Sequence, residues 1–401
     1  MSLSEEVTYL LSPKAVRERT GLLYEKIKSG EGHFSLHEEK LGSVCDYVLE
    51  VIKENYPDLD IPFHSRWGHF KVGDIDRNKM MNEKISSFDA FEKARIKLDL
   101  VITSVLLDAG AGATWKYQEE KNTFSRSEGL AVASWHMFFE GKFSENQSYK
   151  AESSQLIKLQ DSDIEEGFQV SEANPLIGVG GRTGLLKSLG NCVAKQPDAF
   201  KDGRPGNILD YMKDQYGMTF NASDLLKSVL ILFGEIWPAR LTREGVSLGD
   251  VWEHPALGEK GSFESLVPFH KLSQWLTYSL IEVFEEAGFE VKNPQEMTGL
   301  PEYRNGGLLL DMGLIDLKDK EDYKKSHRPD SELIVEWRAL TVTYLDKIGD
   351  VVRDKLGKSA SEFPLAKVLE GGTWWAGRKI AKEKREDGST PLSLASDGTV
   401  F

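Results

Sequence analysis

Apolar side chains recur at helical spacing along most of this chain. The clearest examples are Leu41–Ile52, Phe91–Leu107 and Glu332–Ile348. The alternation of apolar and polar residues that marks a half-buried strand is sparse throughout. We therefore predict a mainly α protein built as a large helical domain.

The most unusual stretch, Leu266–Ala287, is apolar on nearly every face, which predicts a buried helix. Lys271 and Gln274 interrupt it at i, i+3 spacing, so both side chains project from one side. A buried ammonium group is costly unless it meets a carboxylate, a phosphate or a water-filled cavity. A turn-rich polar segment centred on Glu302 offers such a partner. The two segments are either the walls of a polar ligand pocket or a purely structural tie between helices.

Two other segments carry candidate site residues. Residues 61–70 gather aromatic side chains, an arginine and two histidines, among them His64 and Trp67. The spacing of the histidines does not suit metal ligands on a helix, so we expect this segment to line a ligand site or to pack as an aromatic loop. Asp108 follows the end of a buried helix, where a carboxylate opposes the helix dipole. This position suggests a role in a pocket, and the alternative is a cap for the next helix.

Glu336 and Arg338 are the only charged residues within the interior of their predicted helix, 333–345. They are two residues apart and point to different sides, so they do not simply pair with each other. We expect a buried partner or a ligand at Glu336. The glycine-rich stretch 178–184 resembles the hairpin of helix-hairpin-helix proteins, which contacts DNA phosphates; the alternative is a glycine-rich helix start.

Length, charge and cysteine content limit the classes of protein that this chain represents. Its 401 residues, 40% of them apolar, suffice for one compact domain over 1–401, or for two closely packed lobes of about 1–170 and 171–401. The net charge of -14 argues against nucleic-acid and anionic membrane partners. With two cysteines, no secretory leader pattern and no membrane span, we expect a cytoplasmic protein without a metal or other cofactor.

Several motifs together resemble the uracil-catabolism protein 4 family of fungi and bacteria. They are His64-Ser65-Arg66-Trp67, LLDAGAG at 106–112, RSEGLAVAS at 126–134, VPFHKLSQWLTYSLIE at 267–282, TGLPEYRNGGLLLD at 298–311, VEWRALTV at 335–342 and SDGTVF at 396–401. The resemblance covers nearly the whole chain and implies a role in a route that degrades uracil through a ribosylated intermediate and releases urea. We also expect residues 396–401, a turn followed by apolar side chains, to pack on the body of the protein.

The chain is more distantly similar to queuosine salvage proteins, which are N-glycosidases with a helical, DNA-glycosylase-like architecture related to helix-hairpin-helix proteins. Their Lys-Arg-Ala-Gln, Asp-Tyr-Arg and Glu-x-Arg elements fall here on Lys271 to Gln274, Glu302 to Arg304, and Glu336 to Arg338. The aspartate of the second element is catalytic in that family. Its counterpart here is Glu302, one methylene longer.

This similarity implies hydrolysis of an N-glycosidic bond to ribose, as in ribosylurea or its 5-phosphate. The expected catalytic residues are Glu302, Lys271 and Asp108, with His64 as a second candidate for the general acid. The expected substrate-binding residues are His64, Trp67, Gln274, Tyr303, Arg304, Glu336 and Arg338. The alternatives are a non-catalytic protein that binds a ribosyl compound in the same pathway, and a DNA-glycosylase-like nucleic-acid binder, which the acidic charge disfavours.

Overall fold

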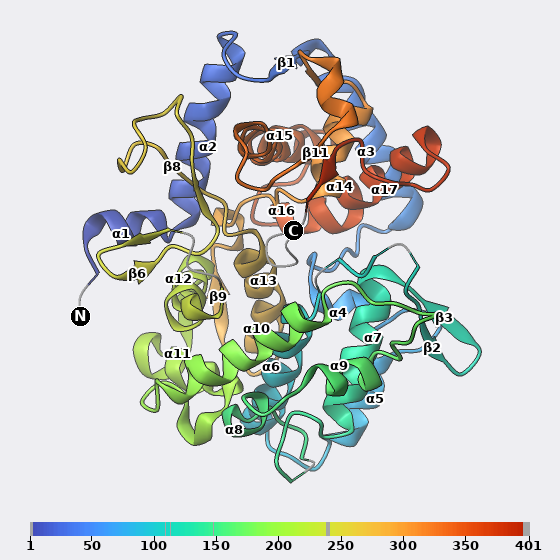
Figure 1. Cartoon of the computed structure of the whole chain (residues 1–401), viewed down its shortest axis with the longest axis vertical. Helices are drawn as coiled ribbons and strands as arrows, with labels where there is room; N and C mark the ends of the chain where they lie inside the picture. The colour runs from blue at the N-terminus through green and yellow to red at the C-terminus, as the bar shows by residue number, and fades with distance from the viewer. Residues whose placement is uncertain (1–2, 109, 113, 147, 238–240, 396–401) are drawn as a thin grey trace. The chain divides into compact units, whose positions relative to one another are not determined.

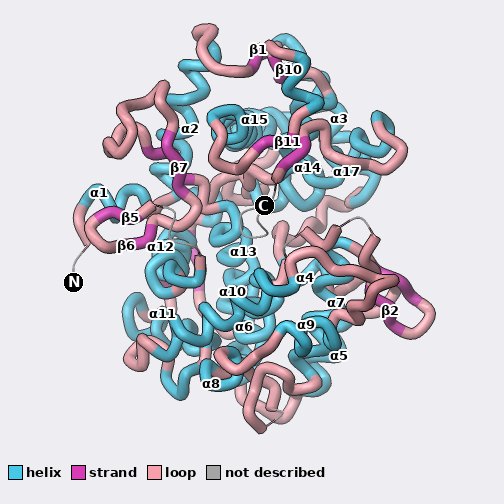
Figure 2. Tube along the Cα trace, viewed as in Figure 1, coloured by secondary structure: helices cyan, strands magenta, loops and turns pink. Residues whose placement is uncertain are grey.

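The computed structural model describes residues 3–108, 110–112, 114–146, 148–237 and 241–395 (Figure 1). Helices dominate, and the strands are two or three residues long and pair in twos within this described part (Figure 2). The predicted mainly α fold is confirmed. The DNA-glycosylase-like architecture stays a prediction, and the predicted packing of residues 396–401 lies outside the described residues.

The described residues form two compact units, and the chain leaves and re-enters each of them. The first unit contains 3–64, 241–274 and 293–395, and the second contains the described residues of 65–237 together with 275–292. One domain over the whole chain, or two closely packed lobes, stays a prediction. Among the described residues, no helix has both the length and the apolar character needed to cross a bilayer.

Helix α15 (Glu332–Leu356) is the centre of the first unit, and α2 (Pro13–Lys28) and α3 (Leu41–Asn55) pack against it (Figure 1). The other helical elements of this unit are α1 (Glu5–Leu10), η1 (Glu38–Lys40), the start of α13 (Lys271–Glu286), η5 (Pro294–Glu296), α14 (Tyr303–Asp311), η6 (Lys320–Lys324), α16 (Leu365–Val368), η7 (Leu369–Thr373) and α17 (Trp374–Lys384). Its strands are β1 (Phe34–Leu36), β5 (Thr242–Arg243), β6 (Val246–Ser247), β7 (Val251–Glu253), β8 (Leu266–Pro268), β10 (Ile315–Leu317), β11 (Ser326–His327) and β12 (Ser393–Leu394).

Helix α13 begins at Lys271, so the prediction of a helix from Leu266 is wrong at its start. Residues 266–268 form β8, which pairs antiparallel with β7 and places Val251 opposite Pro268. His270 then has a positive φ of 50°, which interrupts any helical path before Lys271. A short buried strand and a buried helix both read as an apolar run, which explains the error.

In the second unit, helix α6 (Ala90–Leu106) is buried from Ile96 to Leu106. Helix α7 (Arg126–Phe139) packs against it. The other helical elements are α4 (Arg66–His69), α5 (Arg77–Lys84), α8 (Ser153–Leu156), α9 (Asp161–Gly167), α10 (Val179–Ala194), η2 (Lys201–Gly203), η3 (Pro205–Asn207), α11 (Ile208–Tyr216), α12 (Ala222–Leu232), η4 (Gly234–Ile236) and the rest of α13. Its strands are β2 (Tyr117–Glu119), β3 (Asn122–Phe124), β4 (Thr219–Asn221) and β9 (Glu290–Lys292).

Candidate functional site

Glu302 caps the start of α14 with its own carboxylate. Its Oε2 accepts a hydrogen bond from the backbone N–H of Arg304 at 2.7 Å, and its Oε1 accepts one from the N–H of Asn305 at 2.5 Å. Asp, Asn, Ser and Thr are the usual capping residues, so a glutamate here is unusual. Its two oxygens offer about four acceptor sites, so the cap leaves acceptor capacity for a ligand.

The electrostatic environment of Glu302 combines burial with positive charge. Only 7% of the residue is exposed, and this burial raises the pKa of its carboxyl group above the ordinary value. The two backbone hydrogen bonds and the charges of Lys271 and His64 oppose the rise without cancelling it. The charge of Lys271 thus acts on Glu302 within the first unit, and a ligand pocket between them stays a prediction.

Lys271 is fixed in place by a buried ion pair. Its backbone N–H donates to Oδ2 of Asp250 at 3.0 Å, so Asp250 caps α13 from the residue before β7. Both terminal nitrogens of Arg338 donate to the same carboxylate, at 2.8 and 2.7 Å, and the guanidinium lies 4.1 Å from the ring centroid of Phe269. Burial alone would raise the pKa of Asp250, but Arg338 and the other donors hold it far below its ordinary value. Arg338 thus positions the first residue of α13 through Asp250.

Gln274 is fully buried, and its amide joins α13 to the segment before Glu302. Its nitrogen donates to the backbone oxygen of Phe269 at 3.0 Å and to Oγ1 of Thr298 at 2.7 Å. Its oxygen accepts from the backbone N–H of Thr298 at 3.0 Å. The amide therefore uses most of its hydrogen-bonding capacity on the protein and holds the 298–302 segment beside α13.

Glu336 meets two histidines, as its buried position suggested. It accepts from the backbone N–H of His33 at 2.7 Å, its Oε1 lies 3.0 Å from Nδ1 of the same ring, and His254 Nε2 lies 3.2 Å away. Burial acts to raise the pKa of Glu336, but the hydrogen bonds from His254 and His33 outweigh it and the pKa is lowered. This carboxylate ties His33, just before β1, and His254, just after β7, to α15.

Arg304 and Tyr303 follow Glu302 on the first turn of α14. Arg304 Nη1 donates to the backbone oxygen of Gly388 at 2.8 Å, and its guanidinium lies 5.3 Å from the ring centroid of Tyr303. Arg304 is buried and Tyr303 is half-buried. The backbone of the arginine thus contacts Glu302, while its guanidinium holds the oxygen of Gly388.

The charge of His64 acts on the Glu302 carboxylate, and the ring of His64 pairs with Glu370. His64 Nδ1 lies 2.7 Å from Oε2 of Glu370, which is on η7, and both side chains are largely buried. The ring of Trp374 packs against His64 with 5.6 Å between centroids. Arg378 stacks on Trp374 at 4.8 Å. The first unit thus contains the Glu302 carboxylate, the cationic side chains of Lys271 and Arg304, and the pair formed by His64 and Glu370.

Asp108 and Trp67 lie in the second unit and make structural contacts there. Asp108 Oδ2 is 3.2 Å from Nη1 of Arg66, whose guanidinium is fully buried and also donates to Ser104. The indole N–H of Trp67 donates to the backbone oxygen of Ser279 at 2.8 Å. Both residues belong to the second unit, so their predicted roles beside Glu302 stay predictions.

Comparison with known proteins settles the family. The chain matches the family described as "Protein of unknown function (DUF1688)" over residues 9–401. The chain belongs to this family. It is 38% identical to uracil catabolism protein 4 of Lachancea kluyveri over 443 aligned positions, which cover all of both chains. It is also 38% identical to protein urg3 of Schizosaccharomyces pombe, with 99% of this chain and 100% of that protein covered. The predicted family resemblance is confirmed.

Two potential site residues of this DUF1688 protein, Asp250 and Glu370, were not predicted. Asp250 lies in a Gly-rich connection and reaches Arg338 across 88 positions of the chain, with no periodic signal linking the two. Glu370 precedes two glycines and two tryptophans, an unusual composition for a helix start, but its partner His64 is 306 positions away. The Glu-Gly-Gly-Thr-Trp-Trp string was the available signal for Glu370.

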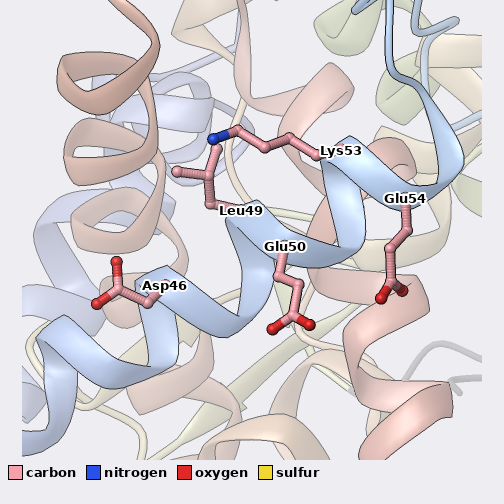
Figure 3. Close-up of a pocket in the computed structure, with 5 residues that line it drawn as sticks. All are labelled: Asp46, Leu49, Glu50, Lys53 and Glu54. Carbon is pink, nitrogen blue, oxygen red and sulfur yellow. The ribbon is translucent and has the colours of Figure 1, made fainter.

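A surface groove of about 570 Å³ lies on α3 of the same unit (Figure 3). It is lined by Asp46, Leu49, Glu50, Lys53 and Glu54. Two of these carboxylates already pair with lysines, Asp46 with Lys355 and Glu54 with Lys379. The groove contains none of the predicted site residues, and its two ion pairs are exposed and contribute little.

Proposed function

We propose that this protein acts in uracil catabolism by hydrolysing the N-glycosidic bond between ribose and a urea-type leaving group, as in ribosylurea or its 5-phosphate. The full-length similarity to a relative named uracil catabolism protein 4 supports the pathway. The observation that carries the chemistry is the buried Glu302 carboxylate, held at a helix start beside the charges of Lys271 and His64.

The carboxylate suits the transition state of this reaction. Ribosyl N-glycosides break with positive charge developing on the sugar ring and the anomeric carbon. A fixed carboxylate stabilises that charge because it is already oriented and largely removed from water. Because burial raises the pKa of Glu302, the group also accepts a proton from the attacking water more readily than an exposed glutamate does.

The neighbouring residues have separate roles in this proposal. Lys271 and Arg304 bind the sugar hydroxyls or a 5-phosphate, which cationic side chains recognise well. Tyr303 lines the ribose. Gln274 and Arg338 act indirectly, because their hydrogen bonds hold the 298–302 segment and the start of α13 in place.

The test is an assay of purified protein with a panel of ribosylurea, its 5-phosphate, uridine and uridine monophosphate, measuring free urea, uracil and reducing sugar. The wild-type protein is expected to release urea from a ribosylurea compound. Glu302→Gln is expected to reduce turnover by about 10²- to 10⁴-fold, because it removes the charge that the transition state requires. Glu302→Asp keeps the charge and is expected to retain part of the activity.

Glu25→Gln is the matched control, since Glu25 is an exposed glutamate on α2 of the same unit. It is expected to leave turnover unchanged. Thermal melting of each variant separates lost chemistry from lost folding, because the cap at α14 itself contributes about 0.5–2 kcal/mol. Tight binding of a ribosyl compound without any turnover by the wild-type protein would instead identify a non-catalytic binding protein and end the hydrolase proposal.

A further inference from the structure

The contact between His64 and Glu370 suits a proton donor, His64, whose ring is oriented by a carboxylate, Glu370. Nδ1 of His64 and Oε2 of Glu370 are 2.7 Å apart, and Tyr56 Oη donates to the other carboxylate oxygen at 3.4 Å. An ionised carboxylate only accepts hydrogen bonds, so Nδ1 of His64 carries a proton. The proton that the proposal below transfers is therefore the one on Nε2. The packed ring of Trp374 limits how far the imidazole can turn.

A π-helical turn places Glu370 beside His64. The five residues of η7, Leu369–Thr373, form a π-helical turn between α16 and α17, and such turns often occur at functional sites. A Cβ on Gly371 would lie 2.6 Å from Ile61. The glycine therefore lets the segment before His64 run directly against the turn that carries Glu370. The backbone N–H of His64 also donates to the oxygen of Ala366 at 3.1 Å.

His64 lies close enough to Glu302 for its charge to act on that carboxylate. The other candidate for the general acid, Asp108, pairs with the buried Arg66 in the second unit. These observations favour the histidine as the group that serves the leaving nitrogen.

We propose that His64 is the general acid of the reaction and that Glu370 is a positioning residue that orients its ring. This inference rests on the proposed function. Urea is a poor leaving group as an anion, so its departure requires a proton at the moment the bond breaks. A purely structural role, in which the pair only fastens residues 61–64 to η7, is the competing explanation.

The reaction step balances with groups that are present. As the bond between the anomeric carbon and nitrogen breaks, its electron pair moves to the nitrogen, which takes the Nε2 proton of His64 and leaves as neutral urea. Water forms the new bond to the anomeric carbon and transfers a proton to Glu302. His64 then regains a proton from solvent and Glu302 releases one. The net change is ribosylurea plus water giving ribose plus urea.

The experiment compares two leaving groups in full-length protein. One substrate is the ribosylurea compound that the wild-type protein hydrolyses, and the other is the matching p-nitrophenyl riboside, whose phenolate departs without protonation. His64→Gln is expected to slow urea release by about 10²- to 10⁴-fold and nitrophenolate release by less than about 10-fold. Glu370→Gln is expected to show the same selectivity at a smaller size, on the order of 10-fold, with partial rescue in Glu370→Asp.

His37→Gln is the matched control, because His37 forms a solvent-exposed pair with Glu39 at 3.7 Å in the same unit. It is expected to leave both rates unchanged. Equal losses on both substrates in the His64 and Glu370 variants, with normal melting temperatures, would overturn the inference and leave the hydrolase proposal intact. Failure of the wild-type protein to release urea from any ribosylurea compound would overturn the proposed function instead.

Discussion

The buried ion pair of Arg338 and Asp250 gives the sharpest stability prediction. Replacing Arg338 by methionine removes the guanidinium while keeping much of the apolar side-chain volume. It leaves the Asp250 carboxylate with the N–H of Lys271 and the indole N–H of Trp252 as its donors. The substitution therefore leaves the negative charge of Asp250 buried, with only neutral hydrogen-bond donors around it.

The expected decrease in the free energy of unfolding follows from the burial of the pair. Breaking a buried pair by removing one partner costs about 3–5 kcal/mol, and the two remaining donors place this case at the lower end, about 3 kcal/mol. Arg338 is 1% exposed and the Asp250 side chain 16% exposed, so solvent screens the pair weakly. Removing Asp250 as well, in Arg338→Met/Asp250→Asn, eliminates the stranded charge and is expected to recover part of the loss.

The dependence on pH has a definite sign. The folded-state pKa of Asp250 lies below its unfolded value, so its contribution to stability is complete above that unfolded value and is lost as the pH falls through the folded one. In Arg338→Met the guanidinium no longer opposes the rise that burial causes in the pKa of Asp250. The buried carboxylate then avoids the desolvation cost by binding a proton. The loss is therefore expected to be smaller at about pH 4.5 than at about pH 7.5.

The assay is urea-induced unfolding followed by far-ultraviolet circular dichroism at both pH values. Arg328→Met is the matched control, because Arg328 also pairs with an aspartate, Asp330, at 2.6 Å but is 78% exposed. Its loss is expected to stay below about 1 kcal/mol. An equal effect of the buried and exposed substitutions, or an Arg338→Met loss that does not shrink at low pH, would refute the reasoning.

Other predictions concern Glu302 and the Glu336 cluster. Because the pKa of Glu302 is raised, turnover is expected to fall as the pH drops through a value above that of an ordinary glutamate, which a pH–rate profile measures. The pKa of Glu336 is lowered, so Glu336→Gln should destabilise the protein at neutral pH and progressively less as the pH falls through the unfolded and then the folded pKa, as melting curves at several pH values would show. Gly32→Ala should lower the melting temperature, because Gly32 has a φ of 72° and its Cβ would lie 2.6 Å from the Glu336 carboxylate; Gly42→Ala, with open space at its Cβ, is the control and should not.

The helical character of the fold could be predicted from the sequence because apolar periodicity is a local property. Helix α6 was expected from Phe91 and is found from Ala90, capped by Asp89. The start of α13 was misplaced because the run from Leu266 to Pro268 gives the same apolar signal in a strand as in a helix.

The candidate site could be predicted only in part. The electrostatic interaction of Lys271 with Glu302 was expected because a charge in an apolar setting needs a partner, and the ligand pocket there stays a prediction. The partners of Arg338 and His64 could not be found in this way, because Asp250 and Glu370 lie in loops or turns whose sequence carries no mark of their distant contacts. Such pairs become visible only when the chain is folded.

The π-helical turn at 369–373 also bears on how this family tolerates change. An α-helix advances about 100° per residue, so deleting one glycine there would turn every later side chain of α17 by roughly that angle. Trp374 would leave the ring of His64, and Gly377 would leave the backbone of Arg304 against which it lies. Insertions and deletions should therefore be rarer in this turn than amino-acid replacements, and a relative that lacks the extra residue should also lack the histidine–glutamate pair.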